Sequence, residues 1–360
     1  MMARRTFLQT LLVGFGLANS ALAGTPKGFY APAEDAPHAR TWMCWPMLPE
    51  DAEGSDLAYV EEVQLTLARL AQTIAQYEPV TLCADRAEHA LIRELCGPDV
   101  QLVHIPTDDM WARDSGPVFV RNPAGVKAAV DFNFNGWGGK QPVPSDKHVA
   151  GAIADHLGCH YFKANIVGEG GGLEYDGDGT LILTESCWVN PNRNPRHSRQ
   201  EIERELKKLL GVQKVIWIPG LAGEDITDGH VDGLLRFVRP GVVMTSLFPH
   251  DDSEQSLADA EAVEILQRAT DARGRALQMV EIPAAEDPAN SSEELFTGYA
   301  NYYVGNGALF TPRFGDKFAD RYAKRTLGKL FPDRKIVMLD VDRIYENGGG
   351  IHCVTQQEPV

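Results

Sequence analysis

The chain ends on ENGGGIHCVTQQEPV, residues 346–360, where three glycines run directly into His352 and Cys353. Chain ends usually fray, so a glycine run and a thiol at this place need an explanation. The segment IHCVTQQ, residues 351–357, is typical of a β-strand, and so is ARTWMCWP, residues 39–46, near the other end. We expect these two strands to pair, which would close the fold into a ring and hold the tail in place.

Between the two ends, one order of elements recurs: a β-rich run, a polar or Gly-rich segment, a hairpin and an amphipathic helix. Each round spans roughly 50 to 70 residues, the size of a supersecondary unit that needs neighbours to bury its faces. The rounds begin at VQLVHIP (100–106), HYFKANIV (160–167), KVIWIP (214–219), LQMVEIP (277–283) and KIVMLDV (335–341). Because both chain ends complete the fifth round, we expect one closed α/β domain, with an ordinary open α/β sheet as the alternative.

The composition indicates which partners suit the chain. Its 360 residues are 44% hydrophobic, which is enough for a large core, and the formal net charge is −16. No block rich in Lys and Arg appears, so the electrostatic footprint of a nucleic-acid-binding protein is missing. A cationic ligand fits this chain better than an anionic one.

The N-terminus, residues 1–23, has the order of an export signal. Arg4 and Arg5 precede a modest apolar run, and Ala21-Leu22-Ala23 provides a small-x-small cleavage site, as in a twin-arginine signal. The alternative is a short membrane anchor, but the run is short and is broken by Gly and Asn. We expect a mature domain, residues 24–360, in the periplasm, with no stable membrane insertion after cleavage.

Six cysteines are scattered along the chain without a C-x-x-C pair. This spacing argues against a zinc ribbon, a redox motif and a disulfide scaffold. Cys83 and Cys96 could pair in an oxidising compartment. For most of the others, a buried small hydrophobic residue is the simplest interpretation.

In every round the polar segment falls between the incoming strand and the hairpin, so these segments should meet near the axis of the ring. Four of the five carry side chains of catalytic types. They are Trp111, Arg113 and Asp114 in WARD, Glu174 in GGGLE, Asp228, His230 and Asp232 in DGHVD, and Cys353 in GGGIHC. The remaining segment, GYANYY at residues 298–303, looks structural.

A Cys, a His, a Glu and two Asp are more than a thiol protease needs, and the excess is acidic. Two or three carboxylates in one pocket raise each other's pKa unless a cation lies between them. A planar guanidinium, with five N–H donors, can satisfy several carboxylates at once. The polar segments therefore predict a site for a guanidinium ligand beside a Cys nucleophile.

Some of these residues have other interpretations. GEGGGLE, residues 168–174, could be a phosphate loop, but no Lys-Ser/Thr follows it. His230 and Asp232 could bind a metal with His352 or Cys353, although their spacing is not diagnostic. On a strand, His352 would face away from Cys353, so we interpret it as a packed histidine.

Two residues of the WARD segment also have structural alternatives. Trp111 could belong to the core, but its acidic neighbours suit a wall of a cation pocket. Arg113 is better explained as a member of a structural ion pair.

Taken together, five motifs resemble the agmatine deiminase and bacterial-type peptidylarginine deiminase family, within the guanidino-modifying pentein superfamily. The resemblance covers the chain from about Gly28 to the C-terminus. The motifs are PAEDAPHARTWMCWP (32–46), WARDSGP (111–117), GGGLEYDGDGTLILTE (170–185), DGHVDG (228–233) and GGGIHCVTQQEP (348–359).

The resemblance implies a five-bladed, pseudo-symmetric α/β propeller, the pentein fold, that hydrolyses a guanidinium to a ureido group and ammonia. Cys353 would be the nucleophile, His230 the acid/base and Glu174 its partner. Asp114 and Asp232 would clamp the guanidinium. No metal or organic cofactor is implied.

The expected partner is a small cationic guanidino substrate. Agmatine is favoured because the acidic chain shows no basic cluster for an α-carboxylate. Peptidyl-arginine is the alternative, which an exported location would suit. A catalytically silent polyamine-binding protein of the periplasm is a third possibility, and assembly into a homo-oligomer is left open.

Overall fold

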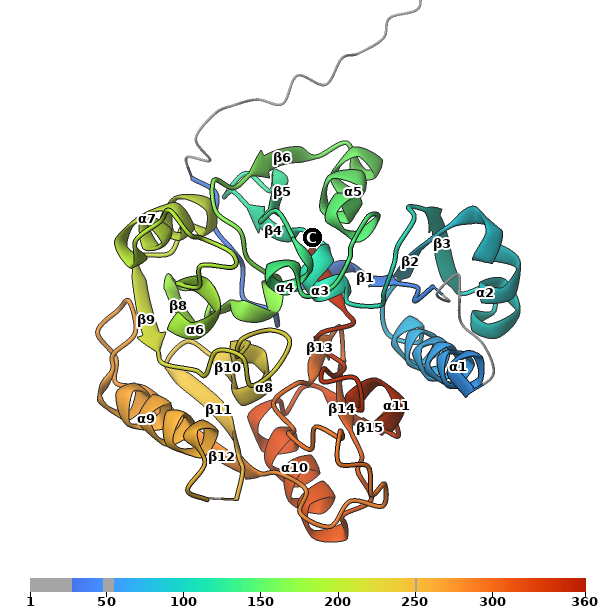
Figure 1. The fold of residues 1–360 in the computed structure, drawn as a ribbon. Coiled ribbons are helices and arrows are strands. Elements are labelled where there is room, and N and C mark those ends of the chain that lie inside the picture. Colours follow the sequence, from blue (N-terminus) through green and yellow to red (C-terminus); the bar gives the residue numbers. More distant parts are fainter. Residues whose placement is uncertain (1–27, 48–54, 250) are drawn as a thin grey trace, which may run out of the picture.

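The computed structural model describes residues 28–47, 55–249 and 251–360, whose strands form five small sheets. Figure 1 shows these sheets and their helices arranged around a common centre. The predicted export signal, residues 1–23, lies outside the described residues. Within the described part, no helix is long and apolar enough to cross a membrane.

Each sheet follows one plan, in which an antiparallel pair of strands is extended by a parallel strand. The first sheet joins both chain ends and contains β16 (Gln356–Pro359), β1 (His38–Cys44), β2 (Val80–Ala84) and β3 (Val100–His104). The other four are β4 (Val118–Arg121), β5 (Lys127–Asp131) and β6 (His160–Lys163); β7 (Glu174–Tyr175), β8 (Thr180–Thr184) and β9 (Lys214–Ile218); β10 (Leu235–Arg239), β11 (Val242–Leu247) and β12 (Gln278–Pro283); and β13 (Tyr303–Gly305), β14 (Ala308–Pro312) and β15 (Lys335–Leu339).

A long helix precedes the first parallel strand of every sheet, because parallel neighbours need a crossover connection. These helices are α1 (Ser55–Ala75), α5 (Val149–Leu157), α7 (Arg199–Leu210), α9 (Glu254–Arg268) and α10 (Lys317–Leu330). Local sequence sets their ends: Ser198 and Glu201 form a capping box at the start of α7, and Gly211 ends it at φ 67°. The largest hydrophobic cluster includes apolar side chains of α1, α10, β2 and β14.

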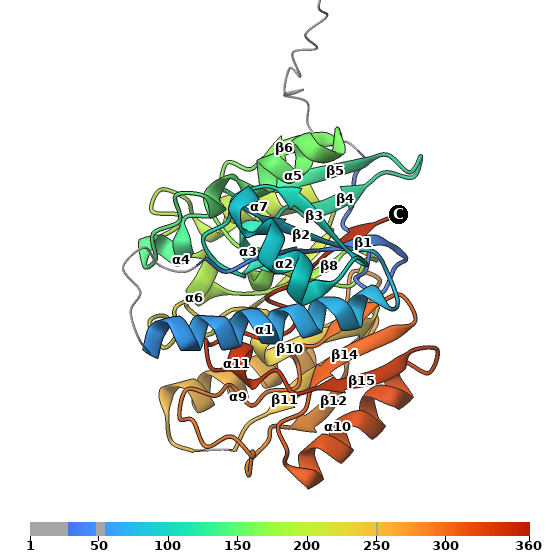
Figure 2. The same ribbon diagram turned by 90° about the vertical axis from the view of Figure 1, so that its right-hand side faces the viewer.

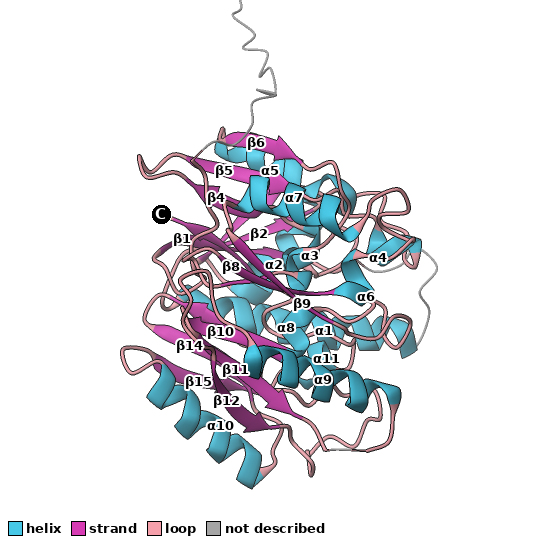
Figure 3. Cartoon of the chain, turned by 90° about the vertical axis from the view of Figure 1, so that its left-hand side faces the viewer, coloured by secondary structure: helices cyan, strands magenta, loops and turns pink. Residues whose placement is uncertain are grey.

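The remaining helical segments are short. They are η1 (Arg86–Glu88), α2 (His89–Cys96), α3 (Ala112–Ser115), α4 (Gly136–Gly139), η2 (Asp146–His148), η3 (Gly170–Gly172), α6 (Glu185–Trp188), α8 (Val231–Leu234) and α11 (Asp342–Tyr345). Figures 2 and 3 show α3, α4 and α6 at one end of the strands, with the C-terminus at the other end. The predicted polar segments contribute α3 and α8, so this end of the ring is where the site should lie.

The predicted pairing of the two chain ends is confirmed. Strand β16 runs antiparallel to β1, with Arg40 opposite Glu358 and Trp42 opposite Gln356. The strand predicted over residues 351–357 is confirmed only at Gln356 and Gln357, because residues 351–354 form a turn. The Val354 N–H donates to the Gly350 carbonyl over 3.3 Å, which holds this turn together. Cys353 therefore sits in a turn immediately before the last strand.

The first sheet is larger than its neighbours. The predicted repeat assigned no element to residues 80–96. In the structure they form β2, η1 and α2, and β3 follows them as a fourth strand of this sheet. The α/β class is confirmed. That the five sheets are pseudo-symmetric blades of a propeller stays a prediction.

Candidate active site

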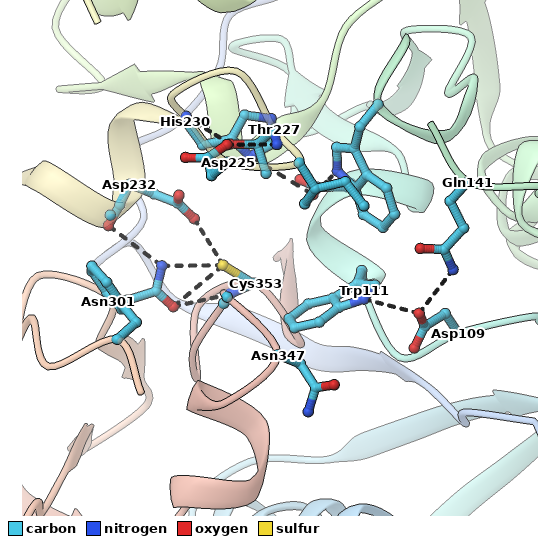
Figure 4. Close-up of a pocket in the computed structure, with 17 residues that line it drawn as sticks. Asp109, Trp111, Gln141, Asp225, Thr227, His230, Asp232, Asn301, Asn347 and Cys353 are labelled. Carbon is cyan, nitrogen blue, oxygen red and sulfur yellow. Dashed lines mark hydrogen bonds and ion pairs between the residues drawn. The ribbon is translucent and has the colours of Figure 1, made fainter. Parts of the chain in front are cut away.

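A pocket of about 290 Å³ opens where α3, α8 and the turn before β16 meet. Figure 4 shows Trp111, His230, Asp232 and Cys353 facing this space. Asp114 lines it too, so five of the six predicted catalytic and binding residues come together. The exception is Glu174.

Two of the glycines at residues 348–350 are needed because the backbone passes close to other side chains before it reaches Cys353. A Cβ atom on Gly349 would lie 2.3 Å from the Trp111 ring, and one on Gly350 would lie 2.5 Å from the Asn301 Oδ1 atom. Gly348 has φ 78°, a conformation that other residues rarely adopt. The backbone can thus pass directly against Trp111, which forms a wall of the pocket as predicted.

Cys353 lies beside polar groups and is only 8% exposed. Its Sγ atom lies 3.1 Å from the Asn301 Nδ2 donor and 3.5 Å from the Asp232 Oδ2 atom. Burial, together with the charges of Asp232 and Asp114, raises the pKa of the Cys353 thiol well above its usual value. In the free protein this group is therefore a thiol.

Asn301 was missed, because GYANYY was interpreted as structural. Its Oδ1 atom accepts hydrogen bonds from the backbone N–H groups of His352, over 3.0 Å, and Cys353, over 3.3 Å. The repeat held the signal, since residues 298–303 occupy the place that carries the catalytic types in the other rounds. Four of the five segments thus contribute residues to the pocket, the exception being GGGLE.

The two predicted clamps have different surroundings. Asp114 accepts hydrogen bonds from the Gly171 N–H, over 3.0 Å, and from the Trp137 Nε1–H, over 2.9 Å. Burial raises the pKa of Asp114 above its usual value. Trp137 was also missed; it has φ 52°, an unusual conformation for a bulky residue that is common at functional sites.

Asp232 has a partner behind the pocket. Its Oδ2 atom lies 2.6 Å from the His352 Nδ1 atom. Burial alone would raise the pKa of Asp232, but the hydrogen bond and charge of His352 outweigh it and lower this pKa. His352 is fully buried, which confirms the packed histidine, although it lies in a turn and not on a strand.

His230 precedes α8 and is 8% exposed. Its Nδ1 atom lies 3.7 Å from the Asp114 Oδ2 atom and has no hydrogen-bond partner among the described residues. Its Nε2 atom lies 3.4 Å from the Glu169 Oε2 atom. Burial would lower the pKa of His230, but Asp114, Cys187 and Glu169 outweigh it and raise this pKa well above its usual value.

The prediction that Glu174 is the partner of His230 was therefore wrong. Glu174 begins β7, where its carboxylate accepts from the Arg236 Nε–H over 2.8 Å and from the Phe237 N–H over 2.6 Å. The η3 turn separates it from Glu169, which stays beside the pocket. The sequence held one signal, because the glycines of GEGGGLE follow Glu169 directly. The structure shows why glycine is needed there, since a Cβ atom on Gly171 would lie 2.6 Å from the His230 Nδ1 atom.

A buried arginine fixes Glu169 in place. The Arg193 Nε–H donates to both Glu169 oxygens, over 2.9 and 3.0 Å, while its Nη1–H donates to Asp228 over 2.7 Å. Burial would raise the pKa of Glu169, but His230 and Arg193 together lower it. Asp228, which the sequence singled out, thus supports the Arg193 side of the site and does not line the pocket.

Behind Asp232 lies a buried row of ionisable side chains. His352 Nε2 lies 3.1 Å from the Glu34 carboxylate, which also accepts from Arg113 over 3.1 Å and pairs with Arg236. The structural ion pair predicted for Arg113 is confirmed. Among the described residues, the trio with metal-ligand spacing is Glu169, Cys187 and His230. The alternative considered from the sequence, His230 and Asp232 with His352 or Cys353, does not have this spacing. All six cysteines are free, Cys83 and Cys96 included.

A family model described as Porphyromonas-type peptidyl-arginine deiminase matches residues 30–359. The chain belongs to this family. Among its relatives, the agmatine deiminase of Stutzerimonas stutzeri is 38% identical, over 94% of this chain and 98% of that protein. The agmatine deiminase of Ectopseudomonas mendocina is likewise 38% identical with the same coverage.

A solved structure supports the same relationship. The agmatine deiminase of Enterococcus faecalis superposes with a TM-score of 0.85 at 30% identity, over 94% of this chain and 98% of that chain. The family assignment made from the five motifs is confirmed. The chain is thus a hydrolase of the guanidino-modifying type.

Proposed function

We propose that this deiminase hydrolyses agmatine to N-carbamoylputrescine and ammonia. The observation that carries the proposal is a pair of buried carboxylates, Asp114 and Asp232, that line one pocket with the Cys353 thiol. A guanidinium can bond to both carboxylates at once, which would bring its central carbon to the sulfur atom. The relatives at 38% identity are named agmatine deiminases.

Substrate binding changes the protonation state of Cys353. Without a cation, burial and the neighbouring carboxylates keep the pKa of the thiol high. A guanidinium between Asp114 and Asp232 neutralises their charges, so the thiol releases its proton to solvent more easily. The thiolate then attacks the central carbon of the guanidinium and forms a C–S bond.

His230 moves the protons in the two halves of the reaction. Because its pKa is raised, it enters the reaction protonated and donates to the departing amino group. Ammonia leaves, and a thiouronium remains on Cys353. Neutral His230 next takes a proton from water as the water attacks the same carbon. The C–S bond then breaks and releases the thiolate, while the ureido oxygen gives its proton to solvent and leaves a neutral product.

The far end of the pocket favours agmatine over arginine. Of the described residues that line it, none is Lys or Arg, so an α-carboxylate would meet no cation there. Asp109 and Asp225 line the same pocket and suit the distal ammonium of agmatine. A peptide would need an open groove, because its backbone continues on both sides of the arginine.

The test is ammonia release from agmatine, free arginine and a blocked arginine peptide, measured side by side. We expect the specificity constant for agmatine to exceed that for the peptide at least tenfold, or about 1.4 kcal/mol of transition-state binding. Equal or reversed preference would assign the chain to peptidyl-arginine, the alternative that the family's description and the predicted leader support. Release from none of them would leave the polyamine-binding alternative.

We also propose that the chain is exported to the periplasm through a twin-arginine signal. The support is the order of residues 1–23, in which Arg4 and Arg5 precede an apolar run and a small-x-small cleavage site. Cleavage there would remove two basic residues and leave 32 basic against 50 acidic, a net charge of −18. A periplasmic location would expose the enzyme to external guanidino compounds.

A further inference from the structure

Glu169, Cys187 and His230 bring a ligand atom each to within 4.8 Å of one another. They come from three segments: Glu169 precedes η3, Cys187 lies in α6, and His230 precedes α8. The reaction proposed above has no use for Cys187, which is fully buried with its Sγ–H directed at the Glu169 carboxylate. A thiol, an imidazole and a carboxylate are also the donors that zinc prefers in proteins.

Two of the three separations within this trio match those in a tetrahedral zinc site. The His230 Nε2 and Glu169 Oε2 atoms are 3.4 Å apart, and the Cys187 Sγ and Glu169 Oε2 atoms are 3.6 Å apart. Bond lengths of about 2.0 to 2.1 Å to N and O and about 2.3 Å to S place tetrahedral neighbours about 3.4 Å (N to O) and about 3.6 Å (S to O) apart. The side chains are therefore spaced for the ion without a large rearrangement.

Arg193 does not block such an ion. Its Nε–H contacts both oxygens of Glu169, and a carboxylate offers about four lone-pair sites, so Oε2 can still bind a second partner. The guanidinium instead holds Glu169 in one orientation, as hydrogen-bonded groups around metal sites commonly do. His230 reaches from this trio to the pocket, where its other nitrogen lies near Asp114.

We propose that Glu169, Cys187 and His230 form a zinc site, and that zinc bound there inhibits the enzyme. Binding displaces two protons to solvent, one from the Cys187 thiol and one from the Nε2 atom of His230, and the ion then occupies both atoms. With the ion between them, His230 no longer contacts Glu169. The metal-bound imidazole can then neither donate a proton to the departing amino group nor take one from the attacking water. The binding part of this proposal stands on geometry alone, whereas the inhibitory part rests on the proposed function.

The experiment must separate this site from the catalytic thiol, which could also bind zinc. Cobalt(II) is the probe, because a cobalt–thiolate bond gives a near-ultraviolet charge-transfer band, and zinc then competes for the site. The starting protein is the full-length Cys353→Ala variant, to which Cys187→Ala is added. Cys96→Ala in the same background is the matched control, since Cys96 is another buried thiol.

We expect the cobalt band and tight zinc competition in Cys353→Ala and in its Cys96→Ala derivative. Adding Cys187→Ala should abolish the band and weaken zinc binding at least about 100-fold, since a ligand is lost outright. Should the Cys187→Ala protein not fold, Cys187→Ser retains the size of the side chain, and it should also lose the band. A band that survives either Cys187 substitution, or that Cys353→Ala alone removes, would overturn the proposal.

Thermal unfolding and activity provide independent readouts. Zinc should raise the Tm of Cys353→Ala by mass action and leave that of the Cys187 variant unchanged. In the protein with Cys353 intact, zinc should inhibit ammonia release, and Cys187→Ala should raise the half-inhibiting zinc concentration at least tenfold. Cobalt binding without turnover of agmatine would count against the proposed function, whereas turnover without cobalt binding would count against the zinc site.

Discussion

Replacing Glu169 by Gln tests which glutamate serves the catalytic histidine. The carboxylate lies 3.4 Å from the His230 Nε2 atom, and at an effective dielectric constant of about 20 its charge stabilises an imidazolium by about 5 kcal/mol. The amide of Gln recovers part of this through a hydrogen bond. We therefore expect Glu169→Gln to lower kcat by about 100-fold to about 10,000-fold, the range for loss of general acid–base catalysis.

The pH profile provides the sharper readout. Glu169 helps to raise the pKa of His230, and His230 must be protonated to expel ammonia. In Glu169→Gln this pKa falls, so the alkaline limb of kcat should move to lower pH and the loss should be larger on the alkaline side. The assay is ammonia release at saturating agmatine across the pH range.

Glu174→Gln is the matched control. Glu174 pairs with Arg236 and lies away from His230, so this variant should lower the free energy of unfolding and leave the alkaline limb in place. If Glu174→Gln shifted the alkaline limb while Glu169→Gln did not, the original sequence prediction would be restored. Equal effects of both variants would refute the assignment of Glu169 as the partner.

Three further predictions concern the nucleophile, the clamp and export. Cys353→Ala should abolish formation of the ureido product without unfolding the protein, and activity within a few-fold of the parent enzyme would contradict the mechanism. Asp114→Asn should raise KM for agmatine at least about tenfold. It should also speed alkylation of Cys353 at a fixed pH, because it removes a charge that raises the thiol pKa; unchanged alkylation would refute that cause. Replacing Arg4 and Arg5 by Lys should keep the protein in the cytoplasm, and the exported enzyme should begin near Gly24; an intact N-terminus on periplasmic enzyme would disprove the signal.

The sequence predicted what depends on periodicity and on chemical type. The recurring order of strand, polar segment, hairpin and helix was enough to predict that β16 pairs with β1 and that Asp114, His230, Asp232 and Cys353 meet. Periodicity is a strong signal because each unit must bury its face against a neighbour. The glycine run before Cys353 was recognisable too, although only the structure shows that Trp111 and Asn301 crowd two of its members.

Two of the errors fall where a short turn of irregular backbone decides the direction of a side chain. Between Glu169 and Glu174, the η3 turn decides which carboxylate reaches His230, and a pattern of residue types cannot place such a turn. The same holds for Cys353. A strand was predicted at this position, but Cys353 lies in a turn of four residues that directs it into the pocket. Asn301 was missed for a different reason, since an amide among aromatic residues carries no charge to signal a catalytic role.

If Asp114 and Asp232 clamp the guanidinium as proposed, their surroundings explain why a cation would be bound and a neutral product released. Asp232 is ionised by the protein itself, because His352 lies 2.6 Å behind it and lowers its pKa. The Asp114 oxygens accept hydrogen bonds from neutral donors, Trp137 and Gly171. Burial raises the pKa of Asp114 above its usual value. His230 lies 3.7 Å from Asp114 and lowers this pKa, but not enough to offset burial. A guanidinium would add positive charge between the two carboxylates, and the pair would be favourable only while that charge is present. Conversion to a ureido group removes the charge, so the interaction that captured the substrate weakens at the moment the product forms.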